Sequence, residues 1–301
     1  MLPLAFSDLL QHISDNPWPG WQVEVAGMTV TLMSSAIATM LLVAIALMVV
    51  LPILARRWRT VPHGGANALE VVVVFVRDMI AKPALKDRAY TFLPFLLTMF
   101  VFILAMNMAG LVPLEQIAHI IGAHTGVEVH IGGAPTSVMT LCGGLAAATL
   151  MMIVLTGLQR TAERWRERKG WPWPVCIALS PLLWLVGLSP AVPGRVGAVL
   201  RVPLSLLEFV GAVGKCGALV IRLFANMMSG HVLLGVLLLF VFQAGAAWVE
   251  TGSKHVLHVA PAVVAASVLV SILELVVAGL QAYIFTFLAA MFLGLYAEGQ
   301  H

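Results

Sequence analysis

Two apolar runs near the C-terminus constrain the fold more than any other feature of this sequence. The first covers residues 204–247 and contains no proline, and the second covers residues 256–297. As one helix the first run would extend about 66 Å, whereas the hydrocarbon layer of a bilayer is only about 30 Å thick. Because a short polar turn at 248–255 separates the runs, we expect a long, antiparallel, strongly tilted hairpin.

The composition excludes a soluble enzyme. Of the 301 residues, 60% are apolar and 10% are charged, whereas soluble domains contain about 25% charged residues. We therefore predict an all-α polytopic membrane protein, with about five membrane helices and one amphipathic helix in a single membrane domain over residues 1–301. The expected surroundings are a lipid bilayer, and the weak positive charge gives no reason to expect nucleic acid as a partner.

The other predicted segments precede the hairpin. A first span is expected over residues 28–54, followed by an amphipathic helix at 64–82, and further spans are expected at 91–113 and 135–157. Residues 171–203 are apolar but contain six prolines. Since proline interrupts helices, a re-entrant or surface-lying segment is expected there rather than a simple span.

The basic residues predict the orientation in the membrane. Of 17 Lys and Arg residues, 15 lie between residues 54 and 215. The predicted spans place the segments that contain these 15 residues on the same side of the bilayer. Under the positive-inside rule, the N-terminus is expected outside and the C-terminus inside. Arg222 and Lys254 are the two exceptions.

Arg222 lies within the first long apolar run. A charge at this depth is costly, and arginine cannot lose its proton to avoid that cost. A snorkelling arginine near a helix end is the simple alternative, but apolar sequence continues for more than ten residues on either side. Such residues face a protein interior or a water path, so we expect a functional role.

Helical spacing places other polar residues relative to Arg222. Residues seven apart share a helix face, so one stripe is predicted to contain Glu208, Lys215, Arg222 and Ser229. Asn226, four residues after the arginine, lies beside it.

His231 falls on the opposite side of this helix from Arg222. Glu274 and Gln281 are seven residues apart on the second helix and share a face there. Histidine and glutamate can exchange protons, which suggests proton handling. An interhelical ion pair between Arg222 and Glu274 is the structural alternative.

Histidines also occur in the predicted outer loop 114–134, at positions 119, 124 and 130. Their spacings of five and six residues suit no single helix face, so we favour solvated side chains over a metal site. No metal or other cofactor is expected.

Three segments together resemble a known family. Residues 221–231, Ile-Arg-Leu-Phe-Ala-Asn-Met-Met-Ser-Gly-His, look like the signature of subunit a in the membrane sector of the rotary F-type ATP synthase. Residues 273–286 resemble that family's second signature, and residues 107–113 resemble a further landmark. The resemblance extends from about residue 28 to residue 297.

The resemblance implies a non-catalytic stator that conducts protons through two offset half-channels beside a ring of c subunits. Arg222 would be the essential arginine that faces the ring carboxylates, separates the half-channels and couples proton flow to rotation. The residues implied for the proton path are His231 and Glu274 in the outer half-channel, Asn107 and Glu115 near its opening, Glu208 and Lys215 toward the inner one, and Asn226, Gln281 and Ser229 near the arginine.

The same resemblance implies b-type peripheral-stalk subunits as further partners and an energy-transducing membrane as the location. A bacterial inner membrane is favoured, and a mitochondrial inner membrane is compatible. His231 and Glu274 favour protons over sodium. Two other functions stay open at this stage: a secondary transporter that binds an anion at Arg222, and a scaffold subunit without transport.

Overall fold

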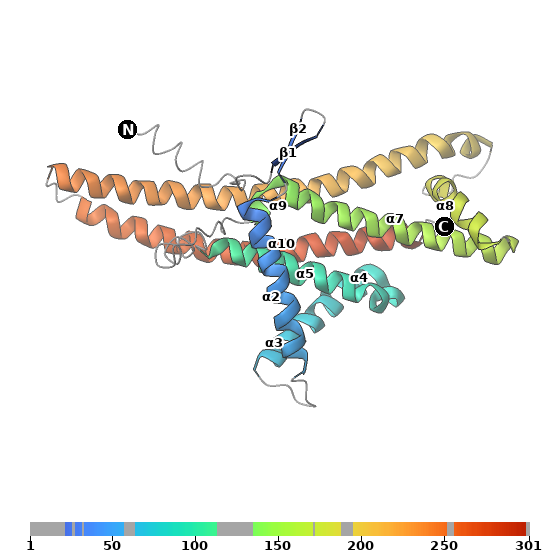
Figure 1. The fold of residues 1–301 in the computed structure, drawn as a ribbon, viewed down its shortest axis with the longest axis horizontal. Helices are drawn as coiled ribbons and strands as arrows, with labels where there is room; N and C mark the ends of the chain where they lie inside the picture. The colour runs from blue at the N-terminus through green and yellow to red at the C-terminus, as the bar shows by residue number, and fades with distance from the viewer. Residues whose placement is uncertain are drawn as a thin grey trace. The chain divides into compact units, whose positions relative to one another are not determined.

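The structure, a computed structural model, describes residues 22–25, 28–31, 33–56, 64–112, 135–170, 172–187, 195–251 and 256–298. Helices make up nearly all of this part of the chain (Figure 1). Five helical segments are long and apolar enough to cross a membrane: Ser35–Arg56, Gly65–Leu111, Met139–Glu167, Val202–Leu237 and Pro261–Leu295. The predicted class, an all-α polytopic membrane protein, is confirmed.

A short β-ribbon precedes the first membrane helix. Strands β1 (Gln22–Val25) and β2 (Met28–Thr31) pair antiparallel, with Gln22 opposite Thr31. Helix α2 (Ser35–Arg56) therefore begins later than the predicted start at residue 28. The backbone N–H of Ile37 donates to the hydroxyl of Ser34 at 3.3 Å, and such a side-chain cap favours a helix start at this point.

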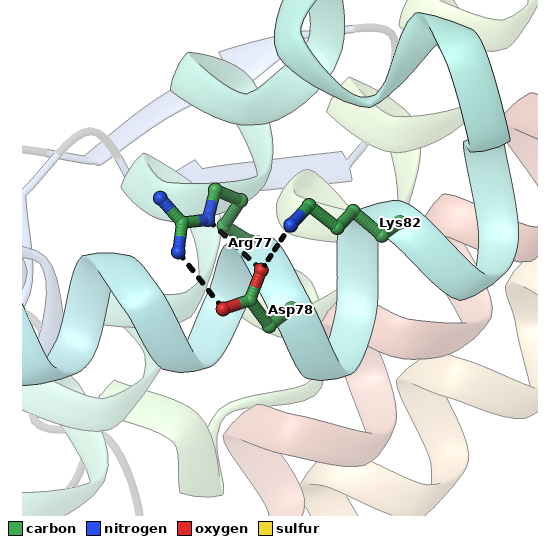
Figure 2. Close-up of polar contacts among 3 residues, drawn as sticks. All are labelled: Arg77, Asp78 and Lys82. Carbon is green, nitrogen blue, oxygen red and sulfur yellow. Dashed lines mark hydrogen bonds and ion pairs between the residues drawn. The ribbon is translucent and has the colours of Figure 1, made fainter.

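The predicted amphipathic helix is divided into three pieces. These are α3 (Gly65–Phe75), the π-helical turn η1 (Val76–Ala81) and α4 (Lys82–Leu85). The carboxylate of Asp78 accepts bonds of 2.9 Å from Nε and Nη2 of Arg77 and lies 2.7 Å from Nζ of Lys82 (Figure 2). Val76 and Ile80 are fully buried on the same turn, whereas Met79 between them is exposed, so only part of the predicted apolar face is buried.

The chain reverses after α4. Lys86 adopts a φ of 47°, which is uncommon for a residue other than glycine, and the 3-10 turn η2 (Lys86–Arg88) leads into α5 (Ala89–Leu111). After η3 (Pro135–Ser137), helix α7 (Met139–Lys169) continues past the predicted end of its span at residue 157 and includes the basic sequence that follows.

A short apolar helix, α8 (Trp173–Gly187), occupies the proline-rich segment. Pro181 lies inside this helix, and Pro172 and Pro174 lie at its start. Proline is tolerated in the first turn because the N–H groups there have no intrahelical partner. Helix α9 (Arg195–Thr251) likewise continues through Pro203, so it begins before the predicted residue 204.

Helices α9 and α10 (Val256–Glu298) are 57 and 43 residues long. At 1.5 Å per residue they extend about 86 Å and about 65 Å, and both exceed the roughly 30 Å hydrocarbon layer. Their lengths therefore agree with the predicted tilted hairpin.

The described chain divides into two compact units. One contains the described residues within Met1–Leu69, Phe100–Cys142 and Arg222–Ala282, and the other contains those within Glu70–Met99, Gly143–Ile221 and Tyr283–His301. Within the first unit, the parts of α9 and α10 on either side of the connecting segment run side by side in opposite directions (Figure 1). The single membrane domain expected from the sequence stays a prediction.

Candidate functional site

A buried polar face lies on α10. Glu274 and Gln281 are only 9% and 4% exposed, whereas Leu273 and Leu275, the neighbours of the glutamate, are exposed. The seven-residue spacing places both polar side chains on one side of the helix. This helix therefore turns its carboxylate and amide into the protein and its leucines outward.

Asn107 of α5 joins this polar face from a second helix. Its side chain is fully buried, and its Nδ2 donates a 3.2 Å hydrogen bond to the backbone oxygen of Ala278 on α10. Ala278 lies between Glu274 and Gln281 along the helix. The bond therefore fixes α5 against the stretch of α10 that contains both buried polar residues.

Glu274 also packs against the backbone of α9 at Gly230. A Cβ atom added at Gly230 would collide with Oε1 of Glu274, and it would also approach Cδ and Cγ at 2.8 and 2.9 Å. Only the absence of a side chain at residue 230 lets the carboxylate reach the helix surface there. His231 follows Gly230 directly, so a carboxyl group of α10 lies beside the α9 backbone at the predicted histidine.

The cluster formed by Asn107, Glu274 and Gln281 is unusual for its unsatisfied polar atoms. Among the described residues, six buried side-chain N or O atoms lack a hydrogen-bond partner. Four of the six belong to this cluster: Oδ1 of Asn107, both oxygens of Glu274 and Nε2 of Gln281. A buried group that nothing bonds costs about 1–3 kcal/mol, so the cluster calls for an explanation other than holding the fold.

Arg222 occupies a different environment in the same unit. Its side chain is exposed, while Leu223 and Met227 on the same helix are buried. Within the described part of the chain Arg222 forms no ion pair, and neither oxygen of Glu274 has a partner. The alternative of an Arg222–Glu274 ion pair is therefore wrong.

Arg222 lies far from both ends of α9, whereas the snorkelling alternative expects an arginine near a helix end. Asn226, one turn further on, is half-buried. The hydroxyl of Ser229, which is exposed, donates to the backbone oxygen of Asn226 at 2.9 Å. A cation and two small polar groups therefore follow one another along an otherwise apolar helix.

Glu208 and Lys215 form a separate pair in the other unit. Nζ of Lys215 lies 3.6 Å from Oε1 of Glu208 and 5.7 Å from the centre of the Phe292 ring. An ion pair between residues seven apart agrees with the shared stripe predicted for this part of α9.

Two predicted site residues cannot be located fully. Glu115 and the histidines of the 114–134 loop lie outside the described residues, and only the helical position of His231 is described. Within the part of the chain that the structure covers, no three His, Cys, Asp or Glu residues could together hold a metal ion.

Comparison with known proteins identifies the family. The family model described as ATP synthase A chain matches residues 37–294. The chain belongs to the ATP synthase A chain family. The family that residues 221–231 and 273–286 suggested is thereby confirmed, and the chain is a proton-translocating stator component of the membrane sector.

Bacterial relatives named ATP synthase subunit a support the same assignment. The protein of Chloroherpeton thalassium is 31% identical over 91% of this chain and 69% of its own length. That of Myxococcus xanthus is 34% identical over 87% of this chain and 72% of its own length. The chain is thus a membrane protein of ATP synthesis.

Sequence reasoning found all three residues of this cluster but missed two residues that contact it. Gly230 lies in the signature segment, yet only the contact with Glu274 shows why a glycine is needed there. Ala278 takes part through its backbone oxygen, which no side-chain pattern reveals. A small residue within a membrane helix was the one available signal for Gly230.

Proposed function

We propose that this chain guides protons through two offset half-channels to and from the carboxylates of a ring of c subunits. Arg222 separates the half-channels and couples proton flow to ring rotation. The observation that best supports this role is that one unit contains both an exposed Arg222, which forms no ion pair with the described residues, and a buried cluster of polar atoms without described partners.

The cluster supplies the chemistry for the outer half-channel. Glu274 and His231 accept and pass on protons, Asn107 and Glu115 lie toward the outer opening, and Gln281 is a polar neighbour. Carboxylate and imidazole groups can both transfer protons in water-containing paths. Buried polar atoms without protein partners are the groups that such a path would contact.

Arg222 acts on the ring carboxylate itself. A proton delivered from outside neutralises that carboxylate, which can then enter lipid at far lower cost than its charged form. After nearly a full turn the proton leaves through the inner half-channel, beside Glu208 and Lys215. The charged carboxylate then passes Arg222, with Asn226 and Ser229 beside it, and the fixed cation compensates its charge.

The membrane potential drives this cycle. Moving one charge through 100 mV yields about 2.3 kcal/mol, so several protons are needed for each ATP. The partners in this proposal are the c-subunit ring and the b-type peripheral-stalk subunits. The location is a bacterial inner membrane, with the N-terminus outside and the C-terminus inside, in agreement with the basic residues between 54 and 215.

The decisive experiment measures ATP-driven proton pumping by the whole synthase in vesicles. Arg222→Ala is expected to abolish coupled pumping, because the ring carboxylate would lose its compensating charge. Ile221→Ala is the matched control, since Ile221 is an exposed neighbour on the same helix and its replacement leaves the charge in place. Unimpaired pumping by Arg222→Ala would refute the role.

The same experiment separates the two other functions considered for this chain. A scaffold subunit would tolerate Arg222→Gln without loss of activity. A secondary transporter would move an anion without the ring, and such proteins bind their substrate at broken helices. Helix α9 is continuous through Arg222 from Arg195 to Thr251, so the helix that contains the arginine lacks the break expected of a transporter.

A further inference from the structure

Helix α8 is apolar on nearly every side and much of it is exposed. It contains no charged residue over its 15 positions, and Leu182 is 63% exposed. The other large exposed side chains of this helix are Trp173, Val175, Ile177 and Leu179. A contiguous apolar surface of this kind marks a contact with another molecule or with lipid.

One narrow face holds α8 to the rest of its unit. Cys176, Ser180 and Trp184 are buried, one turn apart along the helix. Trp184 packs so closely on α7 that a Cβ at Gly157 would collide with its indole ring. Its ring also makes an edge-to-face contact with the ring of Phe209 on α9, and the two ring centres are 6.4 Å apart. Helix α8 is thus fixed in place, with its apolar residues directed outward.

Basic and aromatic side chains surround the start of α8. The guanidinium of Arg166 on α7 lies 5.7 Å from the centre of the Trp173 ring. Nζ of Lys169 lies 4.6 Å from the centre of the Trp165 ring. Tryptophan next to Lys and Arg is typical of the level of the lipid headgroups, where cations also attract anionic lipids.

The length of α8 decides whether this helix can cross a bilayer. Its 15 residues extend about 22 Å, which is too short for a hydrocarbon layer of about 30 Å. At its first turn the N–H groups of Val175 and Cys176 both donate to the backbone oxygen of Pro172, and Pro174 has no N–H group. A short helix of this kind can enter apolar surroundings from one side, because most of its backbone groups bond within the helix.

We propose that α8 is embedded in one leaflet of the bilayer and that Arg166 and Lys169 beside it bind the headgroups of anionic phospholipids. The apolar side chains of α8 lie among the acyl chains, and Trp165 and Trp173 mark the headgroup level. The adjoining basic sequence of α7 and the absence of any charged rim on α8 favour anionic lipid over a protein partner. This inference does not depend on the proton path.

The depth of α8 can be measured with a nitroxide label at Leu182→Cys in the full chain, assembled with its membrane sector in lipid nanodiscs. The native cysteines Cys142, Cys176 and Cys216 are all buried, which directs labelling to the new thiol. Two reference sites calibrate the depth: Met48→Cys on the first membrane helix and Glu163→Cys beside the basic sequence.

The label at residue 182 is expected to collide with oxygen as the label at 48 does, and to be shielded from a water-soluble nickel complex. Access to nickel as high as at residue 163 would overturn the proposal, because α8 would then lie in water. Shielding from both reagents with an immobile label would overturn it as well, because a protein would then cover α8.

The headgroup contact needs its own variants. We compare retention of phosphatidylglycerol against phosphatidylcholine by native mass spectrometry for wild type and for the double variant Arg166→Gln/Lys169→Gln. At about 1 kcal/mol for each basic residue, the double variant should bind the anionic lipid about thirtyfold less tightly. The charge-conserving variant Arg166→Lys/Lys169→Arg keeps both cations and should bind it as wild type does. Equal binding by all three proteins would overturn the headgroup assignment.

Discussion

Two carboxylates of this protein lie in opposite environments. Asp78 is 36% exposed and is paired with both Arg77 and Lys82, whereas Glu274 is nearly buried and neither of its oxygens has a partner among the described groups. An exposed pair costs little and contributes little to stability. A buried polar group without a partner is destabilising, so its presence indicates a role other than holding the fold.

The largest effect on proton flux is expected from removing the negative charge of the buried carboxylate. Glu274→Gln keeps the size and hydrogen-bonding capacity of the side chain but removes its titrating group. We expect proton flux through the reconstituted synthase to fall about a hundredfold, within the range that general acid–base groups contribute. Flux is measured by the decay of a pH gradient in vesicles. Wild-type flux in this variant would remove Glu274 from the path.

A smaller effect is expected from moving the same carboxylate without removing it. Gly230→Ala introduces a Cβ that collides with the side chain of Glu274, and that side chain can swing away. We expect flux to fall roughly tenfold through misplacement, with no loss of thermal stability.

Gly217→Ala is the matched control for this experiment. Gly217 lies on the same helix, and a Cβ there would meet nothing within 4 Å. Both variants gain helix propensity equally. If the two variants conduct equally, the contact between Gly230 and Glu274 does not matter for flux.

The third change tests whether the cluster opposes stability. Asn107→Leu removes the bond to Ala278 and the unsatisfied Oδ1 together. Replacing a partly unsatisfied buried polar group by an apolar one of similar size can be nearly neutral, so we expect the midpoint of thermal unfolding to stay close to wild type while flux falls severalfold. Met108→Leu, at the exposed neighbouring position, should change neither. A marked loss of stability in Asn107→Leu would show that the asparagine is structural.

The smallest effect is expected at Asp78. Asp78→Asn breaks the ion pairs drawn in Figure 2, but exposed pairs are screened by water and salt. We expect wild-type proton flux and only a slight shift in the unfolding midpoint, measured at low and high salt. A loss of flux comparable to that of Glu274→Gln would show that both carboxylates are needed for proton flux.

Much of the architecture follows from the sequence because bilayer thickness restricts helices so strongly. The five membrane-length helices, including the long final pair, were predictable from apolar run lengths alone. The boundaries were less predictable. The ribbon of 22–25 and 28–31 depends on strand pairing, and the extension of α7 runs through basic sequence, so hydropathy predicts neither. Helix α9 continues through Pro203 because a helix that packs along its length can absorb one missing hydrogen bond.

The functional residues divide in the same way. The sequence by itself determined that Arg222, Glu274 and Gln281 lie in apolar segments and which of them share a helix face, since helical periodicity needs no tertiary information. Only the tertiary structure decided that Glu274 meets Gly230 rather than Arg222, and that Asn107 of α5 bonds to α10. Contacts between helices depend on packing in three dimensions, which periodicity along one helix does not specify.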